Sequence, residues 1–179
     1  VDLILVGDSV GMVYHGMANT IGVTLEMMIL HGQAVMRGAS HALVVVDLPF
    51  GCYEKSPYAA YDAAVQVIQR TGCQAVKVEV NRKIARSIAF LVDRGIPVVS
   101  HVGLRPQAAN LAGGFKVQGR LQKDREEILA DAKAADDAGA FAIVIEGVES
   151  DLAEQITLAV KAPTIGIGMA VWPMMLAAQ

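Results

Sequence analysis

The sequence predicts an α/β fold built around a parallel sheet, because short apolar runs alternate with segments of helical periodicity. Uninterrupted β-branched runs of this kind are typical of strands that are buried on both faces. Gly72, Gly95 and Gly139 each follow a predicted helix and precede a predicted strand, where a left-handed C-terminal residue is favoured. We expect strands at 3–8, 43–48, 75–80, 97–102, 142–147 and 164–168, and helices at 25–36, 59–71, 82–94, 124–138 and 150–161.

Most of the expected strands end in a side chain that can take part in chemistry. In chain order, the first five apolar runs lead to Asp8, Asp47, Glu79, His101 and Glu146. The carboxyl ends of parallel strands converge on one rim, where α/β active sites are built. Four carboxylates and a histidine gathered there would repel one another unless a cation or protons intervened. The pattern therefore predicts a metal-assisted enzyme.

The helical segments carry their apolar residues on one face. Between residues 82 and 94 the stripe consists of Ile84, Ile88, Leu91 and Val92. The last predicted helix repeats the spacing with Leu152, Ile156, Ala159 and Val160. Such i, i+4, i+7, i+8 stripes indicate amphipathic helices that pack on a core.

Composition narrows the possible classes of protein. A chain of 179 residues is the length of a single domain, which we place at 1–179. The net charge is −3 and the 15 basic residues are scattered, so we expect no nucleic-acid partner. No apolar run has the roughly 18 residues of a membrane span.

Cys52 and Cys73 have no metal-type spacing and indicate reduced thiols, so we expect a cytoplasmic protein. A hydrophobic content of 54% favours a homo-oligomer.

Periodicity alone leaves two architectures open, an open doubly wound sheet and a (β/α)₈ barrel that lacks two strands. The chain of 179 residues is short against the roughly 250 typical of a barrel. The doubly wound sheet usually carries a glycine-rich phosphate loop after its first strand. Here that strand is followed by GDSVGM at 7–12, which lacks the three-glycine spacing and contains an acid that would repel phosphate.

Three of the strand-end acids suit a hard divalent cation. Asp8, Asp47 and Glu79 supply oxygen ligands and leave positions for substrate and water, as Mg²⁺ prefers. Alternatively, each acid caps a neighbouring helix or pairs with a lysine. Asp47 is expected to lie outside the packed layers, at the end of its strand.

Lys77 and Glu79 are two residues apart on one strand and therefore face the same way. A lysine that points inward needs an anionic partner, either a rim acid such as Glu79 or a bound substrate.

Seven motifs resemble the ketopantoate hydroxymethyltransferase family, in the family's order from residue 1 to residue 168. They are VGDSVGM at 6–12, VDLPF at 46–50, KVE at 77–79, HVGL at 101–104 with PQ at 106–107, GGFKVQGR at 113–120, IE at 145–146 and TIGIG at 164–168. The resemblance implies a (β/α)₈ TIM barrel of the phosphoenolpyruvate-mutase-like kind. It also implies transfer of a hydroxymethyl group from 5,10-methylenetetrahydrofolate to 3-methyl-2-oxobutanoate, which gives 2-dehydropantoate in the first step of pantothenate biosynthesis.

The resemblance also implies roles for individual residues. Asp8, Asp47 and Glu79 would form a site for Mg²⁺ or another divalent cation. Asp8 and Asp47 would also lie near the oxo acid. Lys77 would hold the carboxylate of that acid, and Ser9 would donate a further hydrogen bond to it. The cation would stabilise the enolate that forms when a proton leaves C3.

Glu146 and His101 remain to be assigned. Glu146 ends the most apolar strand of the chain and is our candidate general base, with a fourth metal ligand or a structural acid as alternatives. His101 either contacts the substrate or is a satisfied structural histidine. The glycine-rich stretch at 113–120 is expected to form a loop over the rim, where Lys116 and Arg120 either meet the acidic tail of folate or are simply solvated.

Two other functions stay open on the sequence. One is a Mg²⁺-dependent lyase or mutase of the same barrel superfamily that acts on another 2-oxo acid, and the other is a non-catalytic metabolite-binding barrel. The family is often decameric, so the resemblance implies a homo-oligomer. Because the family begins with a further strand and continues differently after Gly168, we expect the natural chain to extend beyond both ends, with a further segment near 168/169.

Overall fold

The computed structural model describes residues 1–108 and 118–168, and its centre is one parallel sheet of six strands. The strands are β1 (Leu3–Val6), β2 (Leu43–Asp47), β3 (Ala75–Glu79), β4 (Val98–Gly103), β5 (Ala142–Glu146) and β6 (Thr164–Ile167). All six expected strands are present and end within a residue or two of the expected positions.

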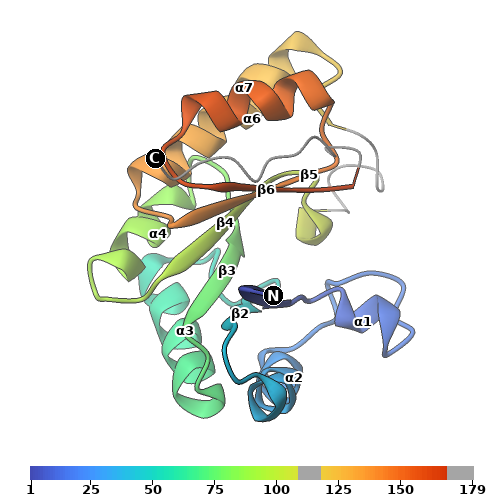
Figure 1. The fold of residues 1–179 in the computed structure, drawn as a ribbon, viewed down its shortest axis with the longest axis vertical. Coiled ribbons are helices and arrows are strands. Elements are labelled where there is room, and N and C mark those ends of the chain that lie inside the picture. The colour runs from blue at the N-terminus through green and yellow to red at the C-terminus, as the bar shows by residue number, and fades with distance from the viewer. Residues whose placement is uncertain (109–117, 169–179) are drawn as a thin grey trace.

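The strand order distinguishes between the two architectures. The strands follow one another in space as they do in sequence, β1-β2-β3-β4-β5-β6, and every neighbouring pair is parallel. A doubly wound sheet would reverse its order at a switch point and carry helices on both faces. Here the helices lie along the outer side of a curled sheet (Figure 1). The arrangement is that of a partial barrel, which excludes the doubly wound alternative.

Each expected helix is present. The helices are α1 (Val10–Val13), α2 (Leu25–Gly38), α3 (Pro57–Thr71), α4 (Ala85–Val92), α6 (Gln122–Asp137) and α7 (Ser150–Ala159), with a short 3₁₀ helix η1 (Pro106–Ala108). Two short elements, α1 and η1, were not expected. Helix α4 starts three residues later than predicted, because the Asn81 side chain accepts hydrogen bonds from the backbone N–H groups of Lys83 and Ile84 and forms a turn there.

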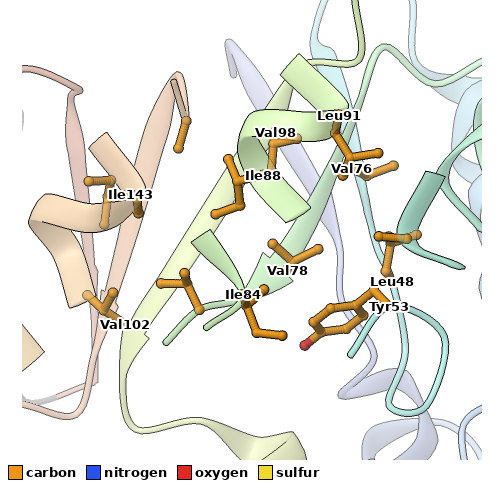
Figure 2. Packing of buried hydrophobic residues seen from close by; sticks show 14 of the residues in the cluster. Leu48, Tyr53, Val76, Val78, Ile84, Ile88, Leu91, Val98, Val102 and Ile143 are labelled. Atoms are coloured by element: carbon orange, nitrogen blue, oxygen red, sulfur yellow. The ribbon is translucent and has the colours of Figure 1, made fainter. Parts of the chain in front are cut away.

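The main apolar core lies between the outer face of the sheet and the helices. Figure 2 shows Ile84, Ile88 and Leu91, around helix α4, packed over the outward side chains of β3 and β4. Ile88 and Leu91 are completely buried. The stripe predicted from the spacing of these residues therefore faces the core.

The inner face of the sheet has a second, smaller apolar layer. Val45, Ala75, Val99, Ala142 and Val144 form a separate buried cluster there, below the carboxyl ends of the strands. In the described part of the chain, β1 and β6 are the two edges of the sheet. The inward side chains of these edges are partly exposed, with Leu5 at 39% and Ile165 at 37%.

No helix within residues 1–108 and 118–168 is long and apolar enough to cross a membrane. Most of the glycine-rich stretch at 113–120 and the segment that follows Gly168 lie outside the described residues. Within that stretch, the side chain of Arg120 is exposed and lies 3.7 Å from the carboxylate of Glu149.

Candidate active site

The strand-end residues come together on the inner side of the sheet, as predicted. Alternation along β3 turns Val76 and Val78 toward the helices, where they belong to the main core. Lys77 and Glu79 therefore point inward. Asp8, Asp47, Lys77, Glu79 and His101 are all buried, with 7% or less of each residue exposed. The side chain of Glu146 is more accessible, at 24%.

Lys77 pairs with Asp47 rather than with Glu79. The two residues are partners across β2 and β3, and Lys77 Nζ lies 2.9 Å from Asp47 Oδ1. Our expectation that Asp47 lies outside the packed layers is wrong, because only 2% of this residue is exposed. Register explains the pairing, since directly opposed residues on neighbouring strands approach more closely than residues two apart on one strand.

His101 connects Lys77 to Glu146. His101 Nδ1 lies 3.4 Å from Lys77 Nζ, and His101 Nε2 lies 3.2 Å from Glu146 Oε2. An ammonium can only donate and a carboxylate can only accept. A neutral imidazole with its proton on Nε2 can accept from Lys77 through Nδ1, while Nε2 lies close to Glu146 without the geometry of a hydrogen bond. Burial, helped by the charge of Lys77, lowers the pKa of His101 and favours this neutral form.

A second group of contacts holds Asp8 and Glu79. The Gln107 side-chain amide donates to Asp8 Oδ2 at 2.8 Å, and the Gln107 backbone N–H donates to Glu79 Oε1 at 2.9 Å. The backbone N–H of Asp8 donates to Asp47 Oδ2 at 3.0 Å, which joins the two groups of contacts. The site is therefore one connected polar network that involves residues from the ends of five strands.

Two acids of this network, Asp8 and Glu79, have raised pKa values. Burial, followed by the charge of Asp47, raises the pKa of Asp8 to about 6. Burial raises the pKa of Glu79 to about 8, although the hydrogen bond from Gln107 opposes the shift. Burial alone would lower the pKa of Lys77, but the nearby carboxylates, Asp47 foremost, outweigh it and raise this pKa. Protons and one lysine thus offset the charge repulsion that the sequence predicts at the rim.

Ser9 lies at the start of α1, beside this network. Its residue is exposed, and its side chain makes no capping hydrogen bond to the short helix. A Cβ placed on Gly7 would lie 3.1 Å from Ser9 Oγ and 3.6 Å from Asp47 Oδ2. Glycine at position 7 therefore lets the chain run close to Asp47 while the Ser9 hydroxyl remains accessible at the rim.

The donor atoms at the rim suit a hard cation, but they are not arranged as a finished metal centre. Asp8, Asp47 and Glu79 are buried carboxylates in one network, and oxygen ligands of this kind are those that Mg²⁺ prefers. In the part of the chain that the structure describes, no three His, Cys, Asp or Glu side chains form a group that could hold a metal ion. Each of the three carboxylates instead contacts a protein donor, and each retains free lone pairs.

Two residues of the network, Gln107 and Tyr53, were not predicted from the sequence. The Tyr53 hydroxyl donates to Gln107 Oε1 at 2.5 Å and accepts from the backbone N–H of Glu79 at 3.2 Å. Gln107 was noted only as part of a motif. The available signal was a polar side chain placed shortly after Gly103, at the end of a strand whose neighbours all carry site residues.

Comparison with known sequences finds relatives that share one enzyme name. The chain is 60% identical over 167 residues to the 3-methyl-2-oxobutanoate hydroxymethyltransferase of Hyphomonas neptunium. The aligned region covers 93% of the chain and 61% of that protein. The same figures hold for the enzyme of that name from Phenylobacterium zucineum. The chain thus spans about three fifths of the length of these relatives.

Comparison with solved structures supports the barrel. Phosphonopyruvate hydrolase matches with a TM-score of 0.66 at 15% identity, covering 94% of the chain and 60% of that structure. A protein of Burkholderia cenocepacia J2315, assigned provisionally as a lyase or mutase, matches with a TM-score of 0.69 at 19% identity, covering 98% and 63%. These neighbours are phosphoenolpyruvate-mutase-like TIM barrels, so the fold class inferred from the motifs is confirmed. Because the family model for ketopantoate hydroxymethyltransferase also matches residues 1–172, the chain belongs to that family.

Proposed function

We propose that the protein containing this chain transfers a hydroxymethyl group from 5,10-methylenetetrahydrofolate to 3-methyl-2-oxobutanoate, giving 2-dehydropantoate. The observation that supports this most is the network that joins the inward lysine, the buried acids and Glu146 at one rim. Relatives that are 60% identical carry the name of this enzyme. The reaction requires an oxo acid to be held while a weakly acidic proton is removed from its C3.

Glu146 is the proposed general base. Its side chain is the most accessible acid of the network, so it can reach a bound substrate. His101 Nε2 lies 3.2 Å from one of its oxygens, and the other oxygen is available to accept the C3 proton. In this proposal His101 orients the base and does not contact the substrate, which favours the structural alternative for this residue.

Lys77 is the proposed partner of the substrate carboxylate. Asp47 holds its ammonium on the inner side, and an ammonium has three hydrogens to donate. The ammonium lies 2.9 Å from Asp47 Oδ1 and 3.4 Å from His101 Nδ1, so one hydrogen remains to bind an anionic group. The accessible Ser9 hydroxyl and the adjacent Asp8 would complete the contacts to the oxo acid.

Asp8, Asp47 and Glu79 are the proposed ligands of Mg²⁺ or another divalent cation. Their oxygen donors and their burial suit such a group, although within residues 1–108 and 118–168 the three side chains do not form a closed cluster. When bound, the cation would supply positive charge that stabilises the enolate oxygen. The raised pKa values of Asp8 and Glu79 mean that cation binding would release protons from them.

Two assays on the whole natural protein test the proposal. Deuterium exchange at C3 of 3-methyl-2-oxobutanoate should depend on the divalent cation, and its absence would indicate a non-catalytic binding protein. Formation of 2-dehydropantoate should require 5,10-methylenetetrahydrofolate. Exchange without folate-dependent product would point instead to a lyase or mutase that acts on another 2-oxo acid.

We also propose that the whole protein is a cytoplasmic homo-oligomer, with a decamer as the form that family membership favours. Large apolar side chains are exposed on α1 and α2, including Val13 at 86%, Tyr14 at 76% and Leu30 at 58%. Association would bury them. Sedimentation analysis should give a mass several times that of one chain, and a monomer would contradict this proposal.

A further inference from the structure

Gln107 is the only buried side-chain amide among the described residues, and it takes part in four hydrogen bonds at the rim. Its side-chain nitrogen donates to Asp8 Oδ2 at 2.8 Å and to the backbone carbonyl of Leu48 at 3.0 Å. Its backbone N–H donates to Glu79 Oε1. One residue thus contacts two of the acids at the rim, which lie on different strands.

The contacts allow the amide only one orientation. The Leu48 carbonyl and the Asp8 carboxylate can only accept, so the NH₂ group must face them. The amide oxygen then faces the Tyr53 hydroxyl, which donates to it. The hydroxyl oxygen itself accepts from the backbone N–H of Glu79, so its own proton is free for this bond.

Tyr53 is held rigidly for this role. Its residue is 1% exposed, and Figure 2 shows its ring among the buried side chains, near Leu48 and Ile84. The buried ring therefore holds the Tyr53 hydroxyl beside the amide oxygen of Gln107.

The turn after β4 brings Gln107 to this position. Gly103 has a φ of +89°, and a Cβ added there would lie 2.3 Å from the backbone oxygen of Glu146. Only glycine fits both the dihedral angle and the space. The chain then enters η1, which places the Gln107 side chain over the ends of the neighbouring strands.

We propose that Gln107 is a positioning residue that fixes the Asp8 and Glu79 carboxylates relative to each other, and that Tyr53 keeps its amide in the required orientation. The inference rests on the proposed function, in which these two acids act together on one cation. Neither Gln107 nor Tyr53 needs to touch the substrate or the cation. Hydrogen-bond partners of this kind orient ligands that would otherwise rotate freely.

The test compares Gln107→Leu and Tyr53→Phe with the unaltered whole protein. Calorimetric titration with Mg²⁺, and with Mn²⁺ alone as a second probe, measures binding without the reaction. We expect Gln107→Leu to weaken binding by about 10–100-fold, and Tyr53→Phe to weaken it less. Tyr61→Phe is the matched control, because it removes the hydroxyl of a half-buried tyrosine that packs against Phe90, away from the network, and it should leave binding unchanged.

Kinetics distinguish positioning from general structural damage. If Gln107 positions the acids, a higher Mg²⁺ concentration should restore most of the kcat of both variants. A loss of kcat that persists at saturating Mg²⁺ would overturn the inference, as would unchanged Mg²⁺ affinity in a folded Gln107→Leu protein. Tyr53→Phe removes a single atom, so it provides the same test if Gln107→Leu does not fold. An unaltered protein that binds neither Mg²⁺ nor Mn²⁺ would instead contradict the proposed metal site itself.

Discussion

The two faces of strand β3 serve the molecule in different ways. On the outer face, Val76 and Val78 are at most 2% exposed and pack under helix α4 (Figure 2). On the inner face, Lys77 and Glu79 are nearly as buried, at 5% and 7%, but each contacts a polar partner from another strand or loop. Residues on the two faces are therefore almost equally buried. Apolar packing stabilises the outer residues, whereas polar contacts stabilise the inner ones.

This difference determines what a substitution does. The outer face depends on volume and shape, so many apolar side chains of similar size would serve there. On the inner face each charged group depends on one particular neighbour, and removal of that neighbour leaves a buried charge without compensation. Outer variants should therefore change stability alone, whereas inner variants should change stability together with ligand binding.

Replacement of Asp47 by alanine should have the largest effect on stability. It leaves the buried ammonium of Lys77 without its closest partner, which typically costs about 3–5 kcal/mol. The loss is measured by urea unfolding, and Mg²⁺ binding should weaken in the same variant. In a double-mutant cycle, Lys77→Met should recover part of the loss, because no charge is then left buried. Strict additivity of the two substitutions would contradict the pairing.

Replacement of Ile88 by alanine tests the outer face. Ile88 is completely buried under α4, so its truncation should destabilise the protein by about 2–5 kcal/mol. Because Ile88 contacts the outer layer and not the rim, the Mg²⁺ affinity of the folded variant should be unchanged in calorimetry. A clear loss of Mg²⁺ affinity would show that the two faces are not independent.

A third expected effect is a dependence of stability on pH. Asp8 rises from an ordinary pKa of 3.8 to about 6 and Glu79 from 4.5 to about 8, so between these values the folded protein holds more protons than the unfolded chain. As far as these groups are concerned, stability should therefore be greatest below about pH 4 and fall as the pH rises toward 8.

Thermal unfolding at several pH values, with EDTA and with Mg²⁺, measures this dependence. Mg²⁺ should flatten it, because the cation stabilises the ionised carboxylates. Glu79→Gln should remove the upper part of the dependence. If the variant and the unaltered protein show the same slope between pH 6 and pH 8, the raised pKa of Glu79 is wrong.

The fold was largely predictable because it follows from local periodicity. The apolar runs marked all six strands, and alternation correctly placed Lys77 and Glu79 on the inner face. Strand order could not be predicted from periodicity, since it depends on how the helices pack between successive strands. The motif resemblance supplied the barrel, and the sequential order of the strands supports it.

The contacts within the site were less predictable. The pairing of Lys77 with Asp47 depends on the register of β2 and β3, which no single strand reveals. The burial of Asp47 and the roles of Gln107 and Tyr53 depend on loops that fold over the rim. Helix α1 is too short, at four residues, for a periodic pattern to identify it.

The most direct test of the reactive rim is C3 deuterium exchange of 3-methyl-2-oxobutanoate in Glu146→Gln. This variant keeps the shape and one acceptor oxygen of the side chain but cannot take up a proton. Exchange should fall by about 10²–10⁴-fold relative to the unaltered protein, while Mg²⁺ and oxo-acid binding are retained. An exchange rate equal to that of the unaltered protein would contradict the assignment of Glu146 as the base, and loss of Mg²⁺ binding would identify Glu146 as a metal ligand.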